Sequence, residues 1–480
     1  MKKRMLAAIF GGLLSMAASA AEYNISVDRV QIDTGDFVKE GIGYNGASPG
    51  PVLRFKEGEE VTINVTNNLD EMTSIHWHGL ILPFEQDGVP GISFAGIKPG
   101  ETFTYQFPIV QAGTYWFHSH SGFQEPNGAY GAIVIEPKGR EPFRYDREFV
   151  VQLTDKHPHS GDRIMRNLKM SADYYNRQQQ TMGDFFAESG EKGFMAALRD
   201  RMMWGDMRMM KADIEDVQGF TALINGKGPE QNWTGLFEPG ERIRLRFINS
   251  SAMTYFDVRI PGLEMTVVQA DGNNVQPVNV DEFRIGVAET YDVIVRITDR
   301  KAYTIFAESM GRSGFARGTL APEEGMTAEV PELREAPLLT MADMAGHMDH
   351  GDMNHGDMSK DAMGGMNDDG MDSGEMAGMD HSAMGHGSMG GSDGASMPED
   401  PFYASGSGLM PTASNGGKFL SYADLRAQNP LYEHREPTRE IELRLTGNME
   451  RYEWSINGIK YEDADPIVLQ YGERVRIKFV

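Results

Sequence analysis

Three segments of this 480-residue chain share one short pattern, and an internal repeat of this kind limits the folds open to the chain. In each segment a glycine and a glutamate precede a run of alternating apolar and polar residues, which is the period of a half-buried β-strand. The three copies are Phe55 to Val65, Phe237 to Phe247 and Leu469 to Phe479. They lie about one domain length apart, so the chain should contain successive copies of one strand-rich module.

Strand-like alternation also fills most of residues 22–137 and 219–310, with Gly, Pro and Asn between short runs. Short strands separated by such turn-forming residues are typical of Greek-key β-sandwiches. A single core rarely grows beyond about 250 to 300 residues, so several domains are expected. We predict an all-β fold of tandem Greek-key β-sandwiches, with domain 1 at 21–140, domain 2 at 141–335 and the start of a truncated domain 3 at 401–480.

Domain 2 contains a segment of different composition at about 162–213. Its leucines, methionines and aromatic residues stand among Arg, Lys, Gln and Glu, with few β-branched residues. Straight-chain residues lose little rotamer freedom in a helix, so we expect a helical insertion here.

Residues 1–20 have the three parts of a secretory signal peptide. Lys2 to Arg4 are basic, Met5 to Met16 form an apolar run, and Ala18 to Ala20 are small residues suited to cleavage. The mature chain should therefore begin near residue 21 in an exported protein. No later stretch approaches the roughly 18 apolar residues that span a bilayer, so no membrane span is expected after signal removal.

The net charge argues against nucleic-acid binding, and the absence of cysteine excludes disulfides and thiolate ligands within these residues. The formal net charge is −25 at pH 7, which argues against a nucleic-acid partner because such binding needs a basic surface. The chain contains no cysteine, so these residues offer neither a disulfide nor a metal-binding thiolate.

Two histidine pairs carry the strongest chemical signal. One residue separates His76 from His78, and one separates His118 from His120. On a β-strand, residues i and i+2 point to the same face about 6 to 7 Å apart, so each pair can project two imidazoles into one site. Neutral imidazole is a common ligand of copper and zinc. The pairs therefore predict a four-imidazole metal site.

The residues around these pairs make the pattern specific. It resembles the amino-terminal copper-binding half of multicopper oxidases, whose domains are cupredoxin-type β-sandwiches. Further motifs resemble the bacterial copper-resistance branch of that family along nearly the whole mature chain. The motifs are Thr73 to Leu80, Gln86 to Pro90, Gly113 to Gly122, Asp173 to Asn176, Gly183 to Phe186, Met203 to Gly205, Asn232 to Phe237, Ser251 to Gly262, Ala288 to Val293 and Leu445 to Glu450.

The resemblance implies copper as the cofactor and assigns ligands by position. His76 would bind the type 2 copper, while His78, His118 and His120 would bind the type 3 coppers of a trinuclear cluster. The family completes this cluster, and a type 1 copper site with a cysteine ligand, in a carboxy-terminal domain. This chain lacks cysteine and ends eight residues after the glycine of its third repeat, whereas the first histidine pair follows the first repeat glycine by eighteen and twenty residues. We therefore expect a truncated chain that is inactive alone, and a gene that continues in frame beyond codon 480.

Residues 336–400 form a linker rich in Met, His, Asp and Gly that cannot bury a core, so we expect disorder. Thioether sulfur prefers Cu(I), and imidazole binds either copper state. Handling of substrate copper is therefore favoured over a plain spacer. The candidate residues are Met348, Met353, Met358, Met363, His347, His350, His355, His381 and His386.

A second group of methionines lies in the helical insertion. Packing along a helix face is the favoured interpretation, because methionine fills irregular apolar gaps, and copper handling is the alternative. The group comprises Met202, Met203, Met207, Met209 and Met210.

Other residues carry weaker signals. Asp87 is expected to be a turn residue, with proton delivery near the metal site as the alternative. The pair at 157–159, His-Pro-His, is expected to be a solvated turn because proline makes a poor strand. Trp77, Tyr115 and Trp116 are expected to pack as walls of the site.

The leading hypothesis is a periplasmic copper-resistance multicopper oxidase that oxidises Cu(I), with phenols as a further substrate class, and reduces dioxygen to water. Its partners would be copper ions, dioxygen and other periplasmic copper-handling proteins. The alternative is a non-catalytic protein that sequesters copper through the linker and the histidines. A laccase-like oxidase of organic substrates is a third class, and the methionine-rich linker argues against it.

Overall fold

The computed structural model describes residues 21–340, 343, 409, 411–430, 433, 435–448 and 452–480. The predicted signal peptide at 1–20 and the linker candidates from His347 to His386 lie outside the described residues. The chain divides into one compact unit of Met1–Leu339 with Pro411–Val480 and a second of Thr340–Met410, and every element below belongs to the first. Within the described residues, no helix is both long enough and apolar enough to cross a membrane.

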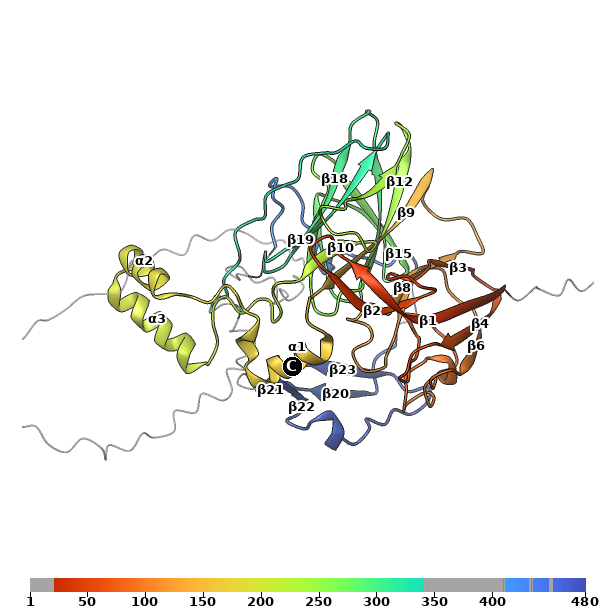
Figure 1. The fold of residues 1–480 in the computed structure, drawn as a ribbon, viewed down its shortest axis with the longest axis horizontal. Coiled ribbons are helices and arrows are strands. Elements are labelled where there is room, and N and C mark those ends of the chain that lie inside the picture. The colour runs from red at the N-terminus through yellow and green to blue at the C-terminus, as the bar shows by residue number, and fades with distance from the viewer. Residues whose placement is uncertain are drawn as a thin grey trace, which may run out of the picture. The chain divides into compact units, whose positions relative to one another are not determined.

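The strands nearest the amino terminus form the two sheets of a first β-sandwich, at the red end of the colour bar in Figure 1. One sheet has the order β2-β1-β4-β6, with β1 at Ala21–Asp33, β2 at Val38–Tyr44, β4 at Glu60–Asn67 and β6 at Thr102–Pro108. The other has the order β3-β8-β7-β5, with β3 at Leu53–Lys56, β5 at His76–His78, β7 at Gly113–His118 and β8 at Tyr130–Glu136. The short 3-10 helix η1 at Phe84–Gln86 lies between β5 and β6.

The core of this sandwich lies between its two sheets. Val61, Ile63 and Val65 of β4 are fully buried and belong to one apolar cluster with Trp77 of β5 and Phe107 of β6. The intervening residues of β4 are more exposed, so the strand shows the half-buried period that the first repeat predicts.

A second β-sandwich follows. Its larger sheet has the order β10-β9-β12-β17-β14-β15, with β9 at Arg147–Lys156, β10 at Thr221–Ile224, β12 at Arg242–Asn249, β14 at Met265–Ala270, β15 at Asn273–Val280 and β17 at Thr290–Arg296. Its smaller sheet has the order β11-β19-β18-β13-β16, with β11 at Trp233–Leu236, β13 at Phe256–Arg259, β16 at Glu282–Ile285, β18 at Tyr303–Ser309 and β19 at Phe315–Ala321.

The described residues near the carboxyl end form two short sheets. One pairs β20 at Arg439–Leu443 with β23 at Val475–Phe479, and the other pairs β21 at Leu445–Asn448 with β22 at Glu453–Ile456. The 3-10 helices η4 at Tyr422–Asp424 and η5 at Tyr461–Asp463 lie in the connections.

The internal repeat has the same structure in each of its three copies. Gly58, Gly240 and Gly472 have φ angles of 92°, 101° and 83°, a region that favours glycine, and the strands β4, β12 and β23 follow them. Each of these strands pairs in parallel with an earlier strand: β4 with β1, β12 with β9 and β23 with β20. The prediction of successive strand-rich modules is thus confirmed by strand pairing as well as by strand position.

The second copy departs from the predicted half-burial. Arg244 and Arg246 occupy the polar positions of β12 but are only 0% and 1% exposed. Asp292 forms ion pairs with both guanidinium groups, at 2.5 Å and 3.1 Å. Glu141 and Glu148 complete the pairing, with 2.8 Å contacts to Arg244 and Arg246 respectively. Both faces of β12 are therefore buried, and the polar face is stabilised by charge pairing instead of water.

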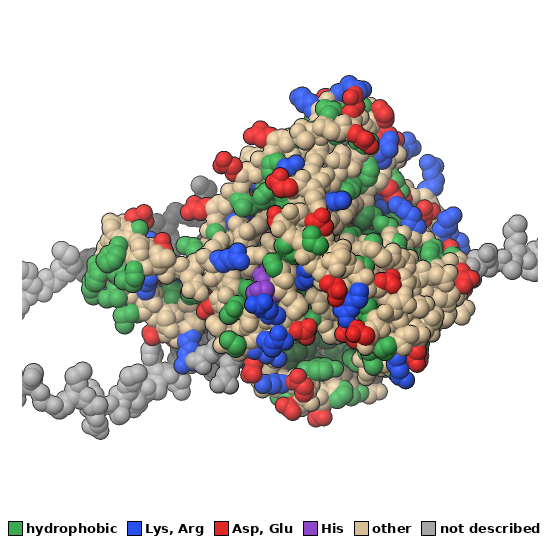
Figure 2. Space-filling model, viewed as in Figure 1, with side chains coloured by type: hydrophobic (Ala, Val, Ile, Leu, Met, Phe, Trp, Pro, Cys, Tyr) green, Lys and Arg blue, Asp and Glu red, His purple; other side chains and the backbone are tan. Residues whose placement is uncertain are grey.

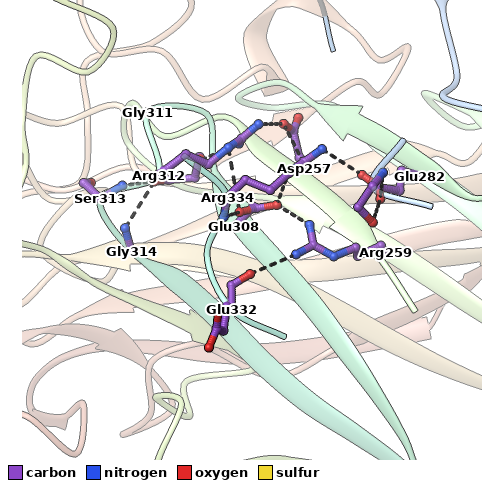
Figure 3. A network of polar contacts seen from close by, with 12 residues as sticks. Asp257, Arg259, Glu282, Glu308, Gly311, Arg312, Ser313, Gly314, Glu332 and Arg334 are labelled. Carbon is purple, nitrogen blue, oxygen red and sulfur yellow. Dashed lines mark hydrogen bonds and ion pairs between the residues drawn. The ribbon is translucent and has the colours of Figure 1, made fainter. Parts of the chain in front are cut away.

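A buried ion network crosses the smaller sheet of the second sandwich (Figure 3). Asp257 of β13 accepts hydrogen bonds from Arg284 and Arg312, both at 2.7 Å, and from Arg334 at 3.3 Å. Arg334 also donates to Glu308 of β18 at 2.6 Å. Burial acts to raise the pKa of Asp257, but the charges of Arg284, Arg312 and Arg334 outweigh it and hold the pKa below its ordinary value. The segment after β19 is fixed to the sheet through Arg334.

The predicted insertion is helical. It contains α1 at Gly161–Met170, the 3-10 helix η2 at Ala172–Tyr174, α2 at Met182–Lys192 and α3 at Phe194–Asp206. Ser160 begins α1 by accepting the N–H of Arg163 at 3.4 Å. Thr181 and Asp184 form a reciprocal capping box at the start of α2. These local signals explain where α1 and α2 begin.

The methionines of the insertion are less buried than predicted. Met202 and Met203 are 60% and 37% exposed, whereas the buried residues of α3 are Ala197 and Trp204. The interpretation as a methionine-packed helix face is therefore wrong for Met202 and Met203. Figure 2 shows hydrophobic side chains gathered over the α2–α3 hairpin. The other exposed apolar residues there are Met182, Phe186, Phe194 and Met195.

Candidate metal centre

The two histidine pairs are carried by neighbouring strands. β5 and β7 pair antiparallel, with His76 opposite His118 and His78 opposite Trp116. His120 lies just beyond β7, where its backbone N–H donates to the Ser74 hydroxyl at 3.0 Å. Directly opposed residues of an antiparallel pair project from the same face, so the strand pairing directs the two motifs toward one point.

The four predicted imidazoles lie together. One ring nitrogen each from His76, His118 and His120 can be chosen so that all three atoms lie within 4.8 Å of one another. His78 joins them, because its Nδ1 lies 3.3 Å from Nε2 of His118. The four predicted histidines thus converge, as their positions on the two strands predict.

Two of the rings have oxygen partners on their far side. Nδ1 of His76 lies 2.8 Å from the carbonyl oxygen of Asp87, and Nδ1 of His118 lies 2.7 Å from Oε2 of Glu125. Such outer partners fix the tautomer in which Nδ1 carries the proton and Nε2 is free to bind a metal. Asp87 also places Oδ1 at 3.4 Å from Nδ1 of His76, so it contacts the site and is more than a turn residue.

Aromatic side chains pack against the imidazole rings of the cluster. Trp116 stacks on His118 with 4.1 Å between ring centroids and an angle of 12° between planes. Trp116 also stacks on His78 at 5.0 Å, and Tyr115 lines a cavity with His78, so these two residues wall the site as expected. Trp77 does not, because its ring packs against Tyr105 and Phe107 in the core of the first sandwich. Glu125 was not predicted from the sequence, since its contact with His118 depends on the turns between β7 and β8.

The environment keeps several rings neutral. Burial, with the neighbouring histidines, lowers the pKa of His78 to about 3 and that of His120 to about 4. Burial also lowers the pKa of His76, although the Asp87 carbonyl and carboxylate oppose the change. These imidazoles are therefore unprotonated at neutral pH, which is the form that binds metal ions.

Two cavities reach the four imidazoles. One of about 730 Å³ is lined by His120 and polar residues that include Glu71. Another, of about 350 Å³, is lined by His78, Asp271 and Glu289. Burial raises the pKa of both Asp271 and Glu289. Small molecules and protons can therefore approach the cluster from two sides.

The pair His157 and His159 lies elsewhere, in the loop after β9. His157 is only 9% exposed, so the prediction of a solvated turn is wrong for this residue. Its Nδ1 accepts the backbone N–H of His159 at 2.9 Å. Proline does keep the segment out of a strand, as predicted, but the loop folds against α1 and a cavity instead of projecting into water.

A cluster of imidazoles with outer hydrogen-bond partners, set on a tandem β-sandwich, defines a candidate metalloprotein of the copper or zinc type. Residues 26–140 and 167–328 each match a family model described as multicopper oxidase. The chain belongs to the multicopper oxidase family, whose members are oxidoreductases.

Two relatives resemble nearly the whole chain. The chain is 51% identical over 476 residues to a Copper resistance protein A homolog from Pseudomonas syringae pv. tomato, a match that covers 96% of this chain and 80% of that protein. It is 50% identical over 500 residues to Copper resistance protein A from Escherichia coli, covering 97% of this chain and 82% of that protein.

Solved structures support the fold. Fet3p, a multicopper oxidase that functions in iron import, superposes with a TM-score of 0.60 at 18% identity, covering 93% of this chain and 65% of Fet3p. A mutant of the laccase from B. aclada gives a TM-score of 0.57 at 21% identity, covering 92% of this chain and 64% of the laccase. The chain thus spans slightly less than two thirds of either structure.

Proposed function

We propose that this chain acts in copper resistance as a periplasmic multicopper oxidase that oxidises Cu(I) and reduces dioxygen to water with four electrons. The observation that carries the proposal is the convergence of His76, His78, His118 and His120 in one cluster. The relatives named for copper resistance favour Cu(I) as the main substrate, with phenols as a further class. The signal peptide predicted at residues 1–20 favours the periplasm.

In this proposal His76 holds the type 2 copper, and His78, His118 and His120 hold the type 3 pair. The residues fit copper because burial lowers the pKa of His76, His78 and His120, and because Nδ1 of His76 and of His118 already has an oxygen partner. When bound, the copper ions supply one-electron redox chemistry. These 480 residues contain no cysteine, so we propose that a type 1 copper site is not among them.

Residues beside the cluster fix the orientation of its imidazoles and can deliver protons to it. Glu125 accepts the Nδ1 proton of His118, and Trp116 stacks on the same ring, so this imidazole has little freedom to rotate. Asp87 is partly exposed beside His76, so its carboxylate oxygens are placed to carry protons from solvent toward the cluster. The reduction of dioxygen to water consumes protons, so a carboxylate that carries protons to the cluster would serve this reaction.

Copper retention tests the ligand set. The 480-residue chain should hold Cu(II) against a competing chelator. The His76→Gln/His118→Gln double variant should lose the copper that is bound at the four-imidazole cluster. Lys98→Gln is the control, since it replaces an exposed residue away from both cavities and should retain the native amount of Cu(II). Equal copper in the double variant and the native chain would refute the proposed ligands.

Oxygen uptake tests electron transfer. We expect the 480-residue chain, loaded with copper and given Cu(I), to consume no dioxygen above the metal-only background, because it contains no cysteine for a type 1 site. A multicopper oxidase that carries a type 1 site should turn over in the same assay. Measurable turnover by the 480-residue chain would contradict the proposed route of electrons.

A further inference from the structure

A second cavity gathers metal-binding side chains away from the four imidazoles. It has a volume of about 500 Å³ and is enclosed by the loop after β9, helix α1 and the loop before β13. Apolar side chains such as Leu168 and Phe220 form much of its wall. His159 from the first element, Met165 from the second and Met253 from the third all line the same space.

The state of His159 suits it to bind a metal. Its Nδ1 lies 2.9 Å from the hydroxyl of Tyr175, which itself accepts a hydrogen bond from Asn167 at 2.8 Å. Among the described residues, Nε2 of His159 has no hydrogen-bond partner. A ring with one nitrogen bonded to an outer partner and the other free is the usual arrangement of a ligating histidine.

His157 has a different role. Its Nδ1 accepts the backbone N–H of His159 at 2.9 Å, so Nε2 must carry the proton when the ring is neutral. A protonated nitrogen cannot bind a metal. Lys39 donates to the carbonyl oxygens of both histidines, at 3.1 Å for His157 and 3.3 Å for His159. His157 and Lys39 therefore position the loop, and His159 is left as the imidazole ligand.

We propose that His159, Met165 and Met253 form a binding site for Cu(I), separate from the four-imidazole cluster. Thioether sulfur is a soft ligand that prefers Cu(I), and neutral imidazole accepts the same ion, whereas zinc favours harder or thiolate ligands. Two sulfurs and one nitrogen would give the ion three ligands, all of types that Cu(I) accepts. The site needs no catalysis, so it does not depend on the proposed oxidase activity.

Charge at the cavity is compatible with a single positive ion. Arg163 and Lys39 lie close enough to His159 to help burial lower its pKa, and they would oppose a bound cation. The carboxylates of Glu125 and Asp155 line the same cavity and offset them. With these charges offset, the choice of ion rests on the two thioether sulfurs, which prefer Cu(I).

The cavity also adjoins the first cluster. Glu125, which faces the cavity, bonds to Nδ1 of His118 at 2.7 Å. Glu125 therefore borders both the cavity and the four-imidazole cluster.

Methionine methyl NMR tests the site residue by residue. The 480-residue chain, labelled with ¹³C in its methionine methyl groups, is titrated with Ag(I) as a redox-inert probe and with Cu(I) under nitrogen, at free concentrations set by a competing ligand. The signals of Met165 and Met253 are assigned from Met165→Leu and Met253→Leu. We expect both signals to shift along one binding curve, and His159→Gln to weaken that curve about tenfold or more.

Three comparisons make the result decisive. Met195→Leu and Met202→Leu remove exposed methionines of α3 and should leave the curve unchanged. The signal of the fully buried Met265 should stay in place in every variant, which shows that the second sandwich remains folded. His118→Gln should weaken Cu(II) retention without moving the Met165 and Met253 curve, so the two copper sites are tested separately. Unshifted Met165 and Met253 signals at saturating Ag(I), or an unchanged curve in His159→Gln, would overturn the proposal.

Discussion

Lys156 is a buried lysine whose positive charge should lower the free energy of unfolding of this chain. Its side chain is completely buried at the end of β9, where Nζ donates to the Asp155 carbonyl at 3.0 Å and to the Thr154 hydroxyl at 3.3 Å. Nζ also lies 4.6 Å from the ring centroid of Tyr130. The described residues place no carboxylate within ion-pair distance of Nζ. The ammonium group is therefore compensated only by neutral dipoles, a ring face and more distant charges.

The size of the penalty follows from the pKa. Burial lowers the pKa of Lys156 from 10.5 to about 8, against the smaller opposing effects of Asp155 and Glu125. At about 1.4 kcal/mol per pH unit, this decrease corresponds to about 3 kcal/mol. Below pH 8 the folded and unfolded chains both carry the proton and the penalty is complete. Between about pH 8 and 10.5 only the unfolded chain binds the proton, so stability rises with pH until the penalty is gone.

Lys156→Met keeps the length of the side chain and removes its charge. At pH 7 the variant should be more stable than the native chain by about 2 kcal/mol, because about 3 kcal/mol of desolvation is relieved and about 1 kcal/mol of hydrogen bonding is lost. This advantage should disappear near pH 10, and above pH 10.5, where the native lysine becomes neutral in both states, the variant should be less stable by about the 1 kcal/mol of lost hydrogen bonding. Urea unfolding followed by tryptophan fluorescence at several pH values measures the difference without adding salt.

Two further measurements support the interpretation. Lys98→Met removes an exposed lysine and should show no such pH-dependent difference. The pKa of Lys39 is lowered to about 8 by burial and then by the charge of Lys156, so it should rise in Lys156→Met, as followed by NMR of the labelled lysine. A variant that is less stable than the native chain at pH 7, by an amount constant with pH, would show that desolvation does not dominate.

Three other substitutions test the site and its support. Glu125→Ala leaves Nδ1 of His118 without its 2.7 Å partner and should weaken copper binding at the cluster about 10- to 100-fold in chelator competition, whereas Glu125→Gln keeps an acceptor oxygen and should recover most of it. Asp257→Ala removes the carboxylate shared by three arginines and should cost about 3 to 5 kcal/mol in urea unfolding; a loss below about 1 kcal/mol would contradict the importance of the network. Gly113→Ala would place Cβ 2.5 Å from the carbonyl oxygen of Gly272 at a φ of 137°, so its thermal midpoint should fall clearly below that of the native chain.

The features that sequence predicts best are those set by local geometry. A glycine turn and a period of two determine where a strand begins and which residues share a face, so β4, β12 and β23 could be located from the repeat. The same rule places His76 with His78 on one face of β5. Their meeting with His118 needed strand pairing, which the family resemblance supplied and the register of β5 with β7 confirms.

The features that sequence missed depend on what covers a surface. Arg244 and Arg246 have the spacing of a solvent-facing strand, yet other parts of the chain bury them. The His-Pro-His sequence that begins at His157 is typical of an exposed turn, but the loop packs beside α1. Met202 is apolar at helical spacing and nevertheless faces solvent. A binary pattern records only which residues differ in polarity, so it cannot tell whether a polar face meets water or an opposite charge.

The burial of Arg246 connects the second sandwich to the candidate metal centre. Its Nη1 donates to the Thr114 hydroxyl at 2.8 Å, and the Thr290 hydroxyl donates to the Thr114 carbonyl at 3.1 Å. Thr114 lies on β7, the strand that ends in His118. Arg246 is itself held by Asp292 at 3.1 Å, so a chain of buried polar contacts runs from β17 through β12 to β7. The second copy of the repeat therefore contributes to the centre by fixing the strand that carries an imidazole, and the position of that imidazole is a property of both sandwiches together.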